Sequence, residues 1–558
     1  MKNLFIAATC IALFSYKESS EFITIQKVNP DLYSINTGTS FYWCNPDNLD
    51  ACIEASKDFM PSIIRFPGGL DANFYHIDGR GYGYKRPPDG ESEDQKTSQD
   101  GDQASSDETP GRFGNSDDNP PRLSDSNDET LRNSPDNDTN CNKLKKAYHF
   151  DKVKRKPYLD PRDALYPKNE NVIHNVINYC KKTSSKILFT CNMMDATYND
   201  NKKVIETILG AGIEIVGIEL GNEMYLQTFE CLKYHSVNIY IDTAKMYETN
   251  LRKDFPNIKI GIVAAPSEVI GINPKRLLYY KKWNEAIKNE TFYDAYIVHH
   301  YMKDKSCDCE NGFSTKDSLK TKMDCHQVSL NKELKTWFGD SGIVAYKKMF
   351  PNKKMWLTEW SSTNVFKCFG NTQASNLFYT AYQNELVKYG DHIEFATFHN
   401  WLGRGKHFPA LAPKGKTFEK RSSSLVFSML KPLFSNRETY ELKIPQQLAE
   451  SVPDSLKVYA YHQPKTPDNK GNVIVIIVNP AGADHTQKIY TDVITIDGKQ
   501  YQLNKGKYTM SHSGTLASSL GNPGFGDATE SIKTESGEVT STIKLKGYSF
   551  TKITYELD

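Results

Sequence analysis

The stretches 217–223, GIELGNE, and 355–360, MWLTEW, decide how this sequence folds. Each is a short apolar run that leads into a glutamate, Glu223 in the first stretch and Glu359 in the second. Runs of this length and composition are typical of buried strands. Each carboxyl group is therefore expected at the end of a strand, where the two could face a common cleft and divide acid and nucleophile roles between them.

Working outward, further short apolar runs recur with helix-like stretches between them. The expected strands are 33–41, 62–66, 186–192, 215–220, 258–264, 293–299, 354–358 and 393–398. The expected helices are 46–59, 169–183, 199–209, 237–255, 274–288 and 371–389. This alternation indicates repeated βα units, and eight such strands close a (β/α)8 TIM barrel. In that fold the active site lies at the C-terminal ends of the strands.

After about residue 435 the pattern changes. Short strand-like runs at 456–461, 472–478, 488–496, 501–503 and 541–555 are separated by Gly, Pro and Asp turns. This pattern indicates an antiparallel β-sandwich, and the strand-like run 22–28 is expected to pair with it. The predicted class is α/β, with a catalytic barrel over 30–435 and a C-terminal sandwich over 436–558.

The first residues resemble a secretory signal. An early lysine is followed by an apolar run of about ten residues, so 1–20 is predicted to be a signal peptide. A frayed N-terminal strand and a lipid-anchored Cys10 are the alternatives. No other segment is long and apolar enough to span a membrane. The expected location is therefore outside the cytoplasm, secreted or periplasmic or at the cell surface.

The net charge of +1 conceals a strongly acidic segment. Residues 87–140 hold fifteen Asp and Glu against four Lys and Arg, a balance of −11 that leaves +12 for the rest. With few apolar residues, this segment is predicted to be a disordered acidic insertion. The positive balance elsewhere favours an anionic partner, although a solvated lysine-rich surface explains it equally simply.

The chain contains eleven cysteines, a number compatible with an oxidising compartment. Cys307, Cys309 and Cys325 cluster in one loop with Cys368 downstream, and disulfides there are expected without a defined pairing. A zinc site is the alternative, but the spacing is not that of a zinc knuckle and His326 is the one neighbouring imidazole. The predicted metal content is none.

Four motifs fall at predicted strand ends in chain order. They are RFPGG at 65–69, GNE at 221–223, HHY at 299–301 and TEW at 358–360. Together they resemble the clan A glycoside hydrolases, which are retaining enzymes on a (β/α)8 barrel, and within that clan the α-L-arabinofuranosidase and heparanase/β-glucuronidase families. The resemblance covers the barrel and the sandwich but not the acidic insertion.

The resemblance implies Glu223 as general acid/base and Glu359 as nucleophile. It implies a supporting and substrate-binding set made of Arg65, Asn222, His299, Tyr301, Trp360, Asn400 and Trp401. Arg65 is expected beneath Glu359, where a guanidinium favours the charged carboxylate.

Asn222 would hydrogen-bond the sugar 2-hydroxyl. Trp401 would form an apolar platform under the sugar ring. Glu219, four residues before Glu223, is expected deeper in the barrel.

The resulting hypothesis is a secreted retaining glycoside hydrolase that degrades a polysaccharide or oligosaccharide by double displacement, with a leaning toward an acidic glycan. This chemistry requires no cofactor, and neither nucleic acid nor a membrane span is expected. The oligomeric state stays open. One alternative is a non-catalytic glycan-binding barrel. Another is a phosphate-binding barrel enzyme that uses the segment 403–406.

Overall fold

The computed structural model describes most of the chain outside residues 82–170. The described residues are 11–12, 21–77, 81, 171–194, 196–226, 229–230, 233–267, 274–302, 328–329, 331–362, 373–403, 409–435, 438–445, 456–467, 470–488, 493–503, 506–513, 532–539 and 542–558. The predicted acidic insertion and the cysteine cluster at 307, 309, 325 and 368 lie outside these residues, as does most of the predicted signal peptide.

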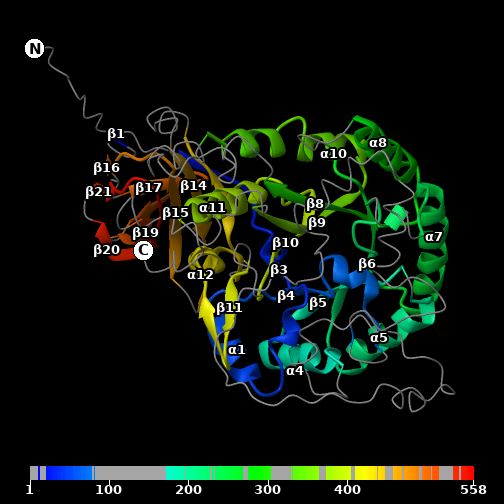
Figure 1. The fold of residues 1–558 in the computed structure, drawn as a ribbon. Helices are drawn as coiled ribbons and strands as arrows, with labels where there is room; N and C mark the ends of the chain where they lie inside the picture. Colours follow the sequence, from blue (N-terminus) through cyan, green and yellow to red (C-terminus); the bar gives the residue numbers. More distant parts are fainter. Residues whose placement is uncertain are drawn as a thin grey trace, which may run out of the picture.

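Eight parallel strands form a closed barrel, which confirms the predicted fold class (Figure 1). In order around the barrel they are β3 (Ser34–Asn36), β4 (Ile63–Phe66), β5 (Lys186–Thr190), β6 (Ile215–Leu220), β7 (Ile260–Val263), β8 (Ala295–Met302), β9 (Lys354–Ser362) and β10 (Ile393–His399). β10 pairs with both β9 and β3 and so closes the ring. All eight C-terminal strand ends therefore open on one face, as a TIM barrel requires.

The first strand is shorter than predicted. β3 ends at Asn36, and the expected continuation is instead a turn followed by the 3₁₀ helix η2 (Ser40–Tyr42). Gly38 has a φ of +48°, a left-handed conformation that cannot continue a strand. Two further 3₁₀ helices, η1 (Pro30–Leu32) and η3 (Leu70–Phe74), flank the first two strands.

Helices surround the barrel (Figure 1). The predicted ones are present as α1 (Leu49–Ser56), α4 (Ile173–Thr183), α5 (Tyr198–Gly210), α7 (Val237–Asp254), α8 (Pro274–Lys288) and α11 (Gln373–Val387). The structure adds α10 (Ile343–Met349) and α12 (Ser422–Ser435). α5 begins at a capping box in which Thr197 and Asp200 each satisfy a backbone N–H of the other. Among the described helices, none is long and apolar enough to cross a membrane.

Trp356 fills the interior of the barrel from β9. Its ring lies against Gly217 on β6 and Gly261 on β7, where an added Cβ would come within 2.5 Å and 2.6 Å of ring atoms. Its indole N–H donates to Glu394 at 2.7 Å. The two glycines therefore provide the space that this large, fully buried side chain occupies.

A methyl group at Gly217 should therefore destabilise the barrel. We expect Gly217→Ala to lower the free energy of unfolding by about 1–3 kcal/mol, because the Trp356 ring must move within a packed core. Gly210→Ala is the matched control, since a Cβ there meets nothing within 4 Å at the end of α5. Urea unfolding compares the two, and an equal stability of both variants would contradict this packing.

Three further sheets lie outside the barrel among the described residues. The largest runs in the order β18 (Lys499–Gln502), β17 (Val493–Ile496), β2 (Glu21–Lys27), β13 (Tyr440–Lys443), β14 (Lys457–Gln463), β15 (Gly471–Asn479), β22 (Ser549–Leu557), β19 (Gly506–Ser513) and β20 (Ile532–Val539). A smaller sheet holds β1 (Ile11–Ala12), β16 (His485–Lys488) and β21 (Thr542–Leu545), and β11 (Leu411–Lys414) forms a hairpin with β12 (Thr417–Lys420). The pairings are antiparallel except β17 with β2 and β1 with β16.

β15 shows how the sandwich joins the barrel. Val473, Val475 and Ile477 belong to an apolar cluster confined to the sandwich, whereas alternate residues such as Ile474 and Ile476 belong to the main core. Both faces of this strand are therefore buried, which explains its continuous apolar sequence. α11 lies between the barrel and this sheet (Figure 1), and its described residues are almost all buried.

Cys44 and Cys52 form a disulfide that links the end of η2 to α1. Cys180 and Cys191 are free and buried. The disulfides predicted for the later loop stay a prediction, because those cysteines lie outside the described residues.

Candidate active site

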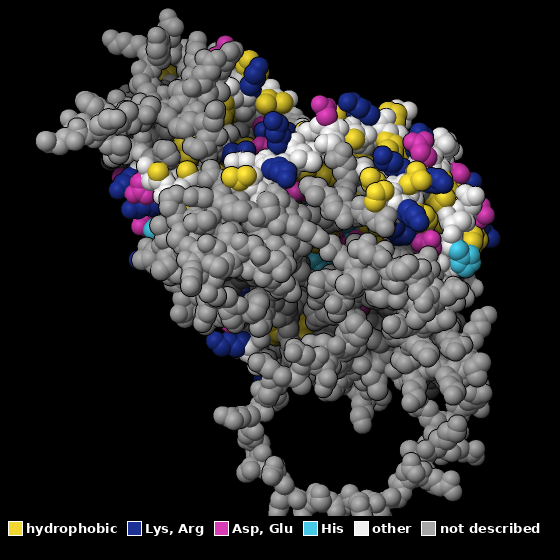
Figure 2. Space-filling model, turned by 45° about the horizontal axis from the view of Figure 1, so that its top comes forward, with side chains coloured by type: hydrophobic (Ala, Val, Ile, Leu, Met, Phe, Trp, Pro, Cys, Tyr) yellow, Lys and Arg dark blue, Asp and Glu magenta, His cyan; other side chains and the backbone are white. Residues whose placement is uncertain are grey.

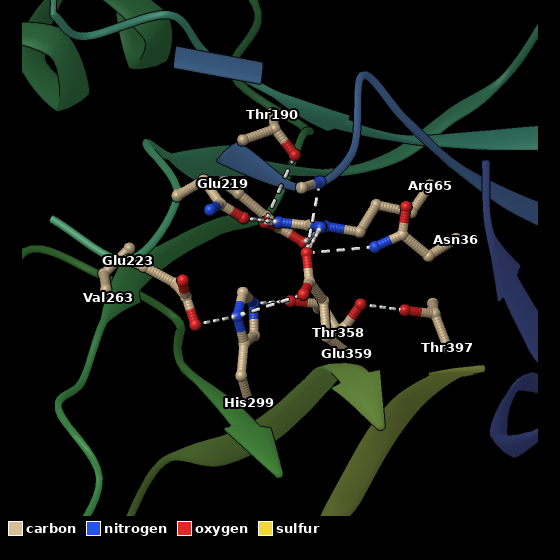
Figure 3. Close-up of polar contacts among 12 residues, drawn as sticks. Asn36, Arg65, Thr190, Glu219, Glu223, Val263, His299, Thr358, Glu359 and Thr397 are labelled. Carbon is tan, nitrogen blue, oxygen red and sulfur yellow. Dashed lines mark hydrogen bonds and ion pairs between the residues drawn. The ribbon is translucent and has the colours of Figure 1, made fainter. Parts of the chain in front are cut away.

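Glu223 and Glu359 face one another at the C-terminal end of the barrel (Figure 3). Glu223 follows β6 by three residues and has a φ of +48°. Glu359 lies within β9 rather than after it, because that strand continues to Ser362 alongside β8. The side chain of Glu223 is 19% exposed and that of Glu359 is 5% exposed, so Glu223 is the more open to solvent.

Four donors surround the carboxylate of Glu359. Oε1 accepts from Nη1 of Arg65 at 2.7 Å, from Nδ2 of Asn36 at 3.1 Å and from the backbone N–H of Gly69 at 3.1 Å. Oε2 accepts from the hydroxyl of Tyr301. This arrangement holds one carboxylate orientation and stabilises its charged form.

Two opposing effects act on the pKa of Glu359. Burial alone would raise this pKa, because it penalises the charged form. The electrostatic effects of His299, His399 and Arg65 together outweigh burial, and the Tyr301 hydrogen bond acts in the same direction. The pKa of Glu359 is therefore well below its usual value, and the group is ionised at neutral pH.

This lowered pKa predicts a loss of stability in acid. A carboxyl whose folded-state pKa is depressed stabilises the fold above its unfolded pKa, and this contribution is lost as the pH falls toward the folded value. Between about pH 5 and pH 3 we expect the wild type to lose on the order of 1–2 kcal/mol more unfolding free energy than Glu359→Gln. Urea unfolding at several pH values measures the difference, and parallel pH curves would contradict an ionised Glu359.

His299 connects the two carboxyl groups. Its Nδ1 lies 3.1 Å from Oε1 of Glu223 and 3.6 Å from Oε2 of Glu359, so these oxygens are less than about 7 Å apart. Its Nε2 lies 3.1 Å from Oγ1 of Thr358, which keeps the ring in place. The hydroxyl of Tyr225 donates to Oε1 of Glu223 at 3.1 Å. Both carboxyls can therefore reach one small group placed between them.

Arg65 is fully buried and binds three side chains at once. Beside its bond to Glu359, it contacts Glu219 through Nε and Nη2, with Nη2 2.6 Å from Oε2. Nη2 also donates to Oδ1 of Asn222 at 2.8 Å. Burial lowers the pKa of Arg65 and the two carboxylates raise it by more, so the guanidinium stays charged. Glu219 lies deep in the barrel, as expected, but its pairing with Arg65 was not predicted.

Asn222 is fixed by hydrogen bonds to Asn73 and Arg65, which leave its side-chain Nδ2 unused within the described part of the chain. Its backbone N–H donates to Oδ1 of Asn73 at 2.9 Å, and Nδ2 of Asn73 donates to its carbonyl oxygen at 2.7 Å. Its Oδ1 is used by Arg65, whereas its buried Nδ2 has no hydrogen-bond partner among the described residues. A buried donor left open in this way is suited to bind a ligand hydroxyl.

Two tryptophans predicted to bind substrate are instead part of the core. Trp360 is fully buried and stacks on Tyr382 of α11 with ring centroids 4.6 Å apart. Trp401 is also fully buried and packs on Phe41 and Tyr179. Successive side chains on a strand point to opposite faces, so an inward Glu359 directs Trp360 outward. The predictions of a sugar platform at Trp401 and of a substrate contact at Trp360 are therefore wrong.

The other predicted residues lie near the carboxyl groups. Arg65, Asn222, His299 and Tyr301 make the contacts given above. Asn400, directly after β10, is half-buried, and its Oδ1 is a buried acceptor with no partner in the part of the chain that the structure describes.

Several residues of the site were not predicted. His399, the last residue of β10, has Nδ1 4.0 Å from Oε2 of Glu359, and burial lowers its pKa. Both His399 and Asn36 end barrel strands, so the rule that identified Glu223 would have found them. Asn73 lies in η3, and its contact with Asn222 has no local sequence signal.

The described residues contain no cluster of three or more His, Cys, Asp or Glu side chains able to hold a metal ion. The zinc alternative concerned cysteines outside these residues.

Comparisons with known proteins rest on structure. No family model matches the sequence. No curated protein matches it either. Among solved structures, a family 51 α-L-arabinofuranosidase from Bifidobacterium longum has a TM-score of 0.59 at 12% identity, with 98% of this chain and 99% of that chain covered.

Two further solved structures are similar to this chain over nearly its whole length. A GH51 arabinofuranosidase from Xanthomonas axonopodis pv. citri has a TM-score of 0.57 at 13% identity, covering 98% of this chain and 99% of that one. An α-L-arabinofuranosidase from Thermotoga maritima, in complex with arabinose, has a TM-score of 0.53 at 15% identity, covering 97% and 100%. The chain therefore has the fold of these structures along nearly its whole length, a (β/α)8 barrel joined to a β-sandwich.

Proposed function

We propose that this protein is a retaining glycoside hydrolase. The observation that carries the proposal is the pairing of an ionised, buried Glu359 with a more exposed Glu223 across His299. Retaining enzymes hold their two carboxyls about 5–5.5 Å apart and inverting enzymes about 6.5–9.5 Å. The two His299 distances place one oxygen of each carboxyl less than about 7 Å apart, which is compatible with the retaining separation.

The contacts support the following role for each group in the proposed reaction. Glu223 donates a proton to the glycosidic oxygen as the bond to the anomeric carbon breaks. Glu359 attacks that carbon and forms a glycosyl ester, which a water molecule then hydrolyses with Glu223 acting as base. The open Nδ2 of Asn222 donates to a sugar hydroxyl, and such a contact strengthens as the transition state forms. Tyr301 and Arg65 keep the nucleophile charged and oriented.

Two separate observations each favour a different substrate class. The structural neighbours named above are arabinofuranosidases, which favours an α-L-arabinofuranoside as the first substrate to assay. The positive balance outside 87–140 instead favours an acidic glycan. On the described part of the face in Figure 2, basic and acidic side chains are interspersed, so that face does not itself select an anion.

Secretion is part of the proposal. The apolar N-terminal run supports export, and the Cys44–Cys52 disulfide fits an oxidising compartment. Expression in a bacterial host, followed by fractionation and N-terminal sequencing of the exported chain, tests it. A protein that stays in the cytoplasm with its first twenty residues intact would contradict export.

Fluorogenic glycosides provide the test of catalysis. An arabinofuranoside and a glucuronide, assayed in parallel, distinguish the neutral from the acidic substrate. Removal of the acid/base by Glu223→Ala should lower kcat about 10²–10⁴-fold, the usual contribution of general acid–base catalysis. Added azide should restore turnover by replacing water in the second step, and should yield a glycosyl azide of retained configuration.

The alternative of a non-catalytic glycan-binding barrel predicts a different outcome. Such a protein would bind glycans in a calorimeter but hydrolyse no glycoside in the panel. Azide would then have no effect on any variant.

A further inference from the structure

Glu219 is a charged residue for which the reaction described above has no direct use. It lies on β6, four residues before Glu223, and its side chain is fully buried. A buried carboxylate costs free energy unless other groups compensate its charge. Glu219 is therefore kept either for the fold alone or for what it does to its partners.

Its contacts define how the guanidinium of Arg65 is oriented. Nε of Arg65 lies 2.9 Å from Oε1 and 3.0 Å from Oε2 of Glu219, and Nη2 lies 2.6 Å from Oε2. Thr190 adds a hydroxyl that donates to Oε2 at 3.2 Å. The Nε edge of the planar guanidinium is thus occupied, which leaves the opposite side for Glu359 and Asn222.

The buried cluster of Arg65, Glu219 and Glu359 holds one positive and two negative charges. One guanidinium lies between two carboxylates, those of Glu219 and Glu359 (Figure 3). If Arg65 faced Glu359 alone, its whole charge would act on the nucleophile and make that carboxylate less reactive. Sharing the cation keeps Glu359 ionised while leaving its oxygens more basic.

We infer that Glu219 is a positioning residue for the proposed glycosidase reaction: it aims Arg65 at Glu359 and Asn222 and offsets part of the positive charge that Arg65 presents to the nucleophile. The inference rests on the proposed function. It adds a residue outside the cleft to the groups on which the rate depends.

Other titratable groups around Glu219 do not supply a competing charge. Cys191 follows β5 and Tyr240 comes from α7. Burial, with the charge of Glu219 added, raises the pKa of both groups, so they are neutral near pH 7. Arg65 from β4 is its one cationic contact among the described residues, and Glu359 from β9 lies on the far side of that cation. A change of charge at Glu219 is therefore felt mainly through Arg65.

Three variants separate charge from geometry. Glu219→Gln removes the charge and one acceptor, so kcat should fall about 10–100-fold with little change in KM. The basic limb of kcat/KM should move to lower pH by about half a unit or more, since one negative charge that helps retain the proton of the acid is gone.

The other two variants keep the charge. Glu219→Asp withdraws the carboxylate from Arg65, so it should lower kcat about tenfold or more and leave the basic limb in place. Thr190→Val removes one hydrogen bond to Glu219 and should also leave the limb in place. If Glu219→Gln fails to fold, the kcat of Glu219→Asp is the deciding measurement. A tenfold loss supports the inference, and an unchanged kcat overturns it.

A measurement without turnover separates this inference from the proposed function. In protein labelled with [δ-¹³C]glutamate, the Glu223 carboxyl signal is assigned by its loss in Glu223→Gln. Its titration midpoint should be lower in Glu219→Gln than in the wild type. An unmoved midpoint overturns the inference, whatever the wild type hydrolyses. A moved midpoint in a protein that hydrolyses no glycoside rejects the proposed function and leaves the charge sharing established.

Discussion

Glu359→Gln should reduce kcat by on the order of 10⁴–10⁶-fold, the cost of removing the nucleophile that the proposed mechanism requires. The amide keeps the size of the side chain but cannot attack the anomeric carbon. It also loses the charge that Arg65 and Tyr301 stabilise. Turnover of an activated aryl glycoside, divided by the concentration of folded protein, gives the ratio of the wild-type kcat to the variant kcat.

The control must carry the same Glu→Gln change at a surface position of the barrel. Glu214→Gln qualifies, because Glu214 is 59% exposed, precedes β6 and pairs with Lys186 on the surface. We expect its kcat to match the wild type. Loss of activity in both variants, or in neither, would remove Glu359 from the nucleophile role.

The stereochemistry gives a second readout. A Glu359→Ala variant with azide should form a glycosyl azide of inverted configuration, because azide attacks from the side that the carboxylate occupied. The Glu223→Ala variant should form the retained product. Identical products from the two variants would contradict the assigned roles.

The largest effect on stability is expected at Arg65. Arg65→Met leaves Glu219 and Glu359 buried and unpaired, so we expect a loss of about 3–5 kcal/mol in unfolding free energy together with the loss of activity. Urea unfolding at pH 7 measures the first effect. A loss below about 1 kcal/mol would mean that the two carboxylates are solvated or protonated without Arg65.

Two further variants test why Arg65→Met should lose stability. Arg65→Lys keeps the charge but cannot bind Glu219, Glu359 and Asn222 at once, so its stability should lie between the wild type and Arg65→Met. Adding Glu219→Gln to Arg65→Met should recover part of the lost stability, because one uncompensated charge is removed. Strict additivity of the two changes would contradict direct coupling.

The barrel and the two carboxyls were predictable because their signals are local. Apolar runs alternate with helical stretches, and Glu223 and Glu359 each follow such a run. The C-terminal ends of parallel strands meet on one face of a barrel, so residues that end strands are brought together there. The same rule would have selected Asn36 and His399, had it been applied to the first and eighth strands.

The tryptophans show where local reasoning stops. Trp360 and Trp401 lie next to residues of the site in sequence, but both turn into the core. Whether a side chain at a strand end faces the cleft or the helices depends on strand register and on where the strand ends. β9 runs to Ser362, beyond the predicted end, and that extension directs Trp360 toward α11.

By itself the sequence determined the order of strands and helices, the barrel with its sandwich, and the two glutamates that meet at its open end. These follow from periodicity, which each segment carries alone. Only the tertiary structure decided that Glu219 shares Arg65, that Asn73 clamps Asn222 and that His299 lies between the carboxyls. Those contacts join residues from different βα units, and their partners are chosen by how the closed barrel brings distant side chains within hydrogen-bond distance.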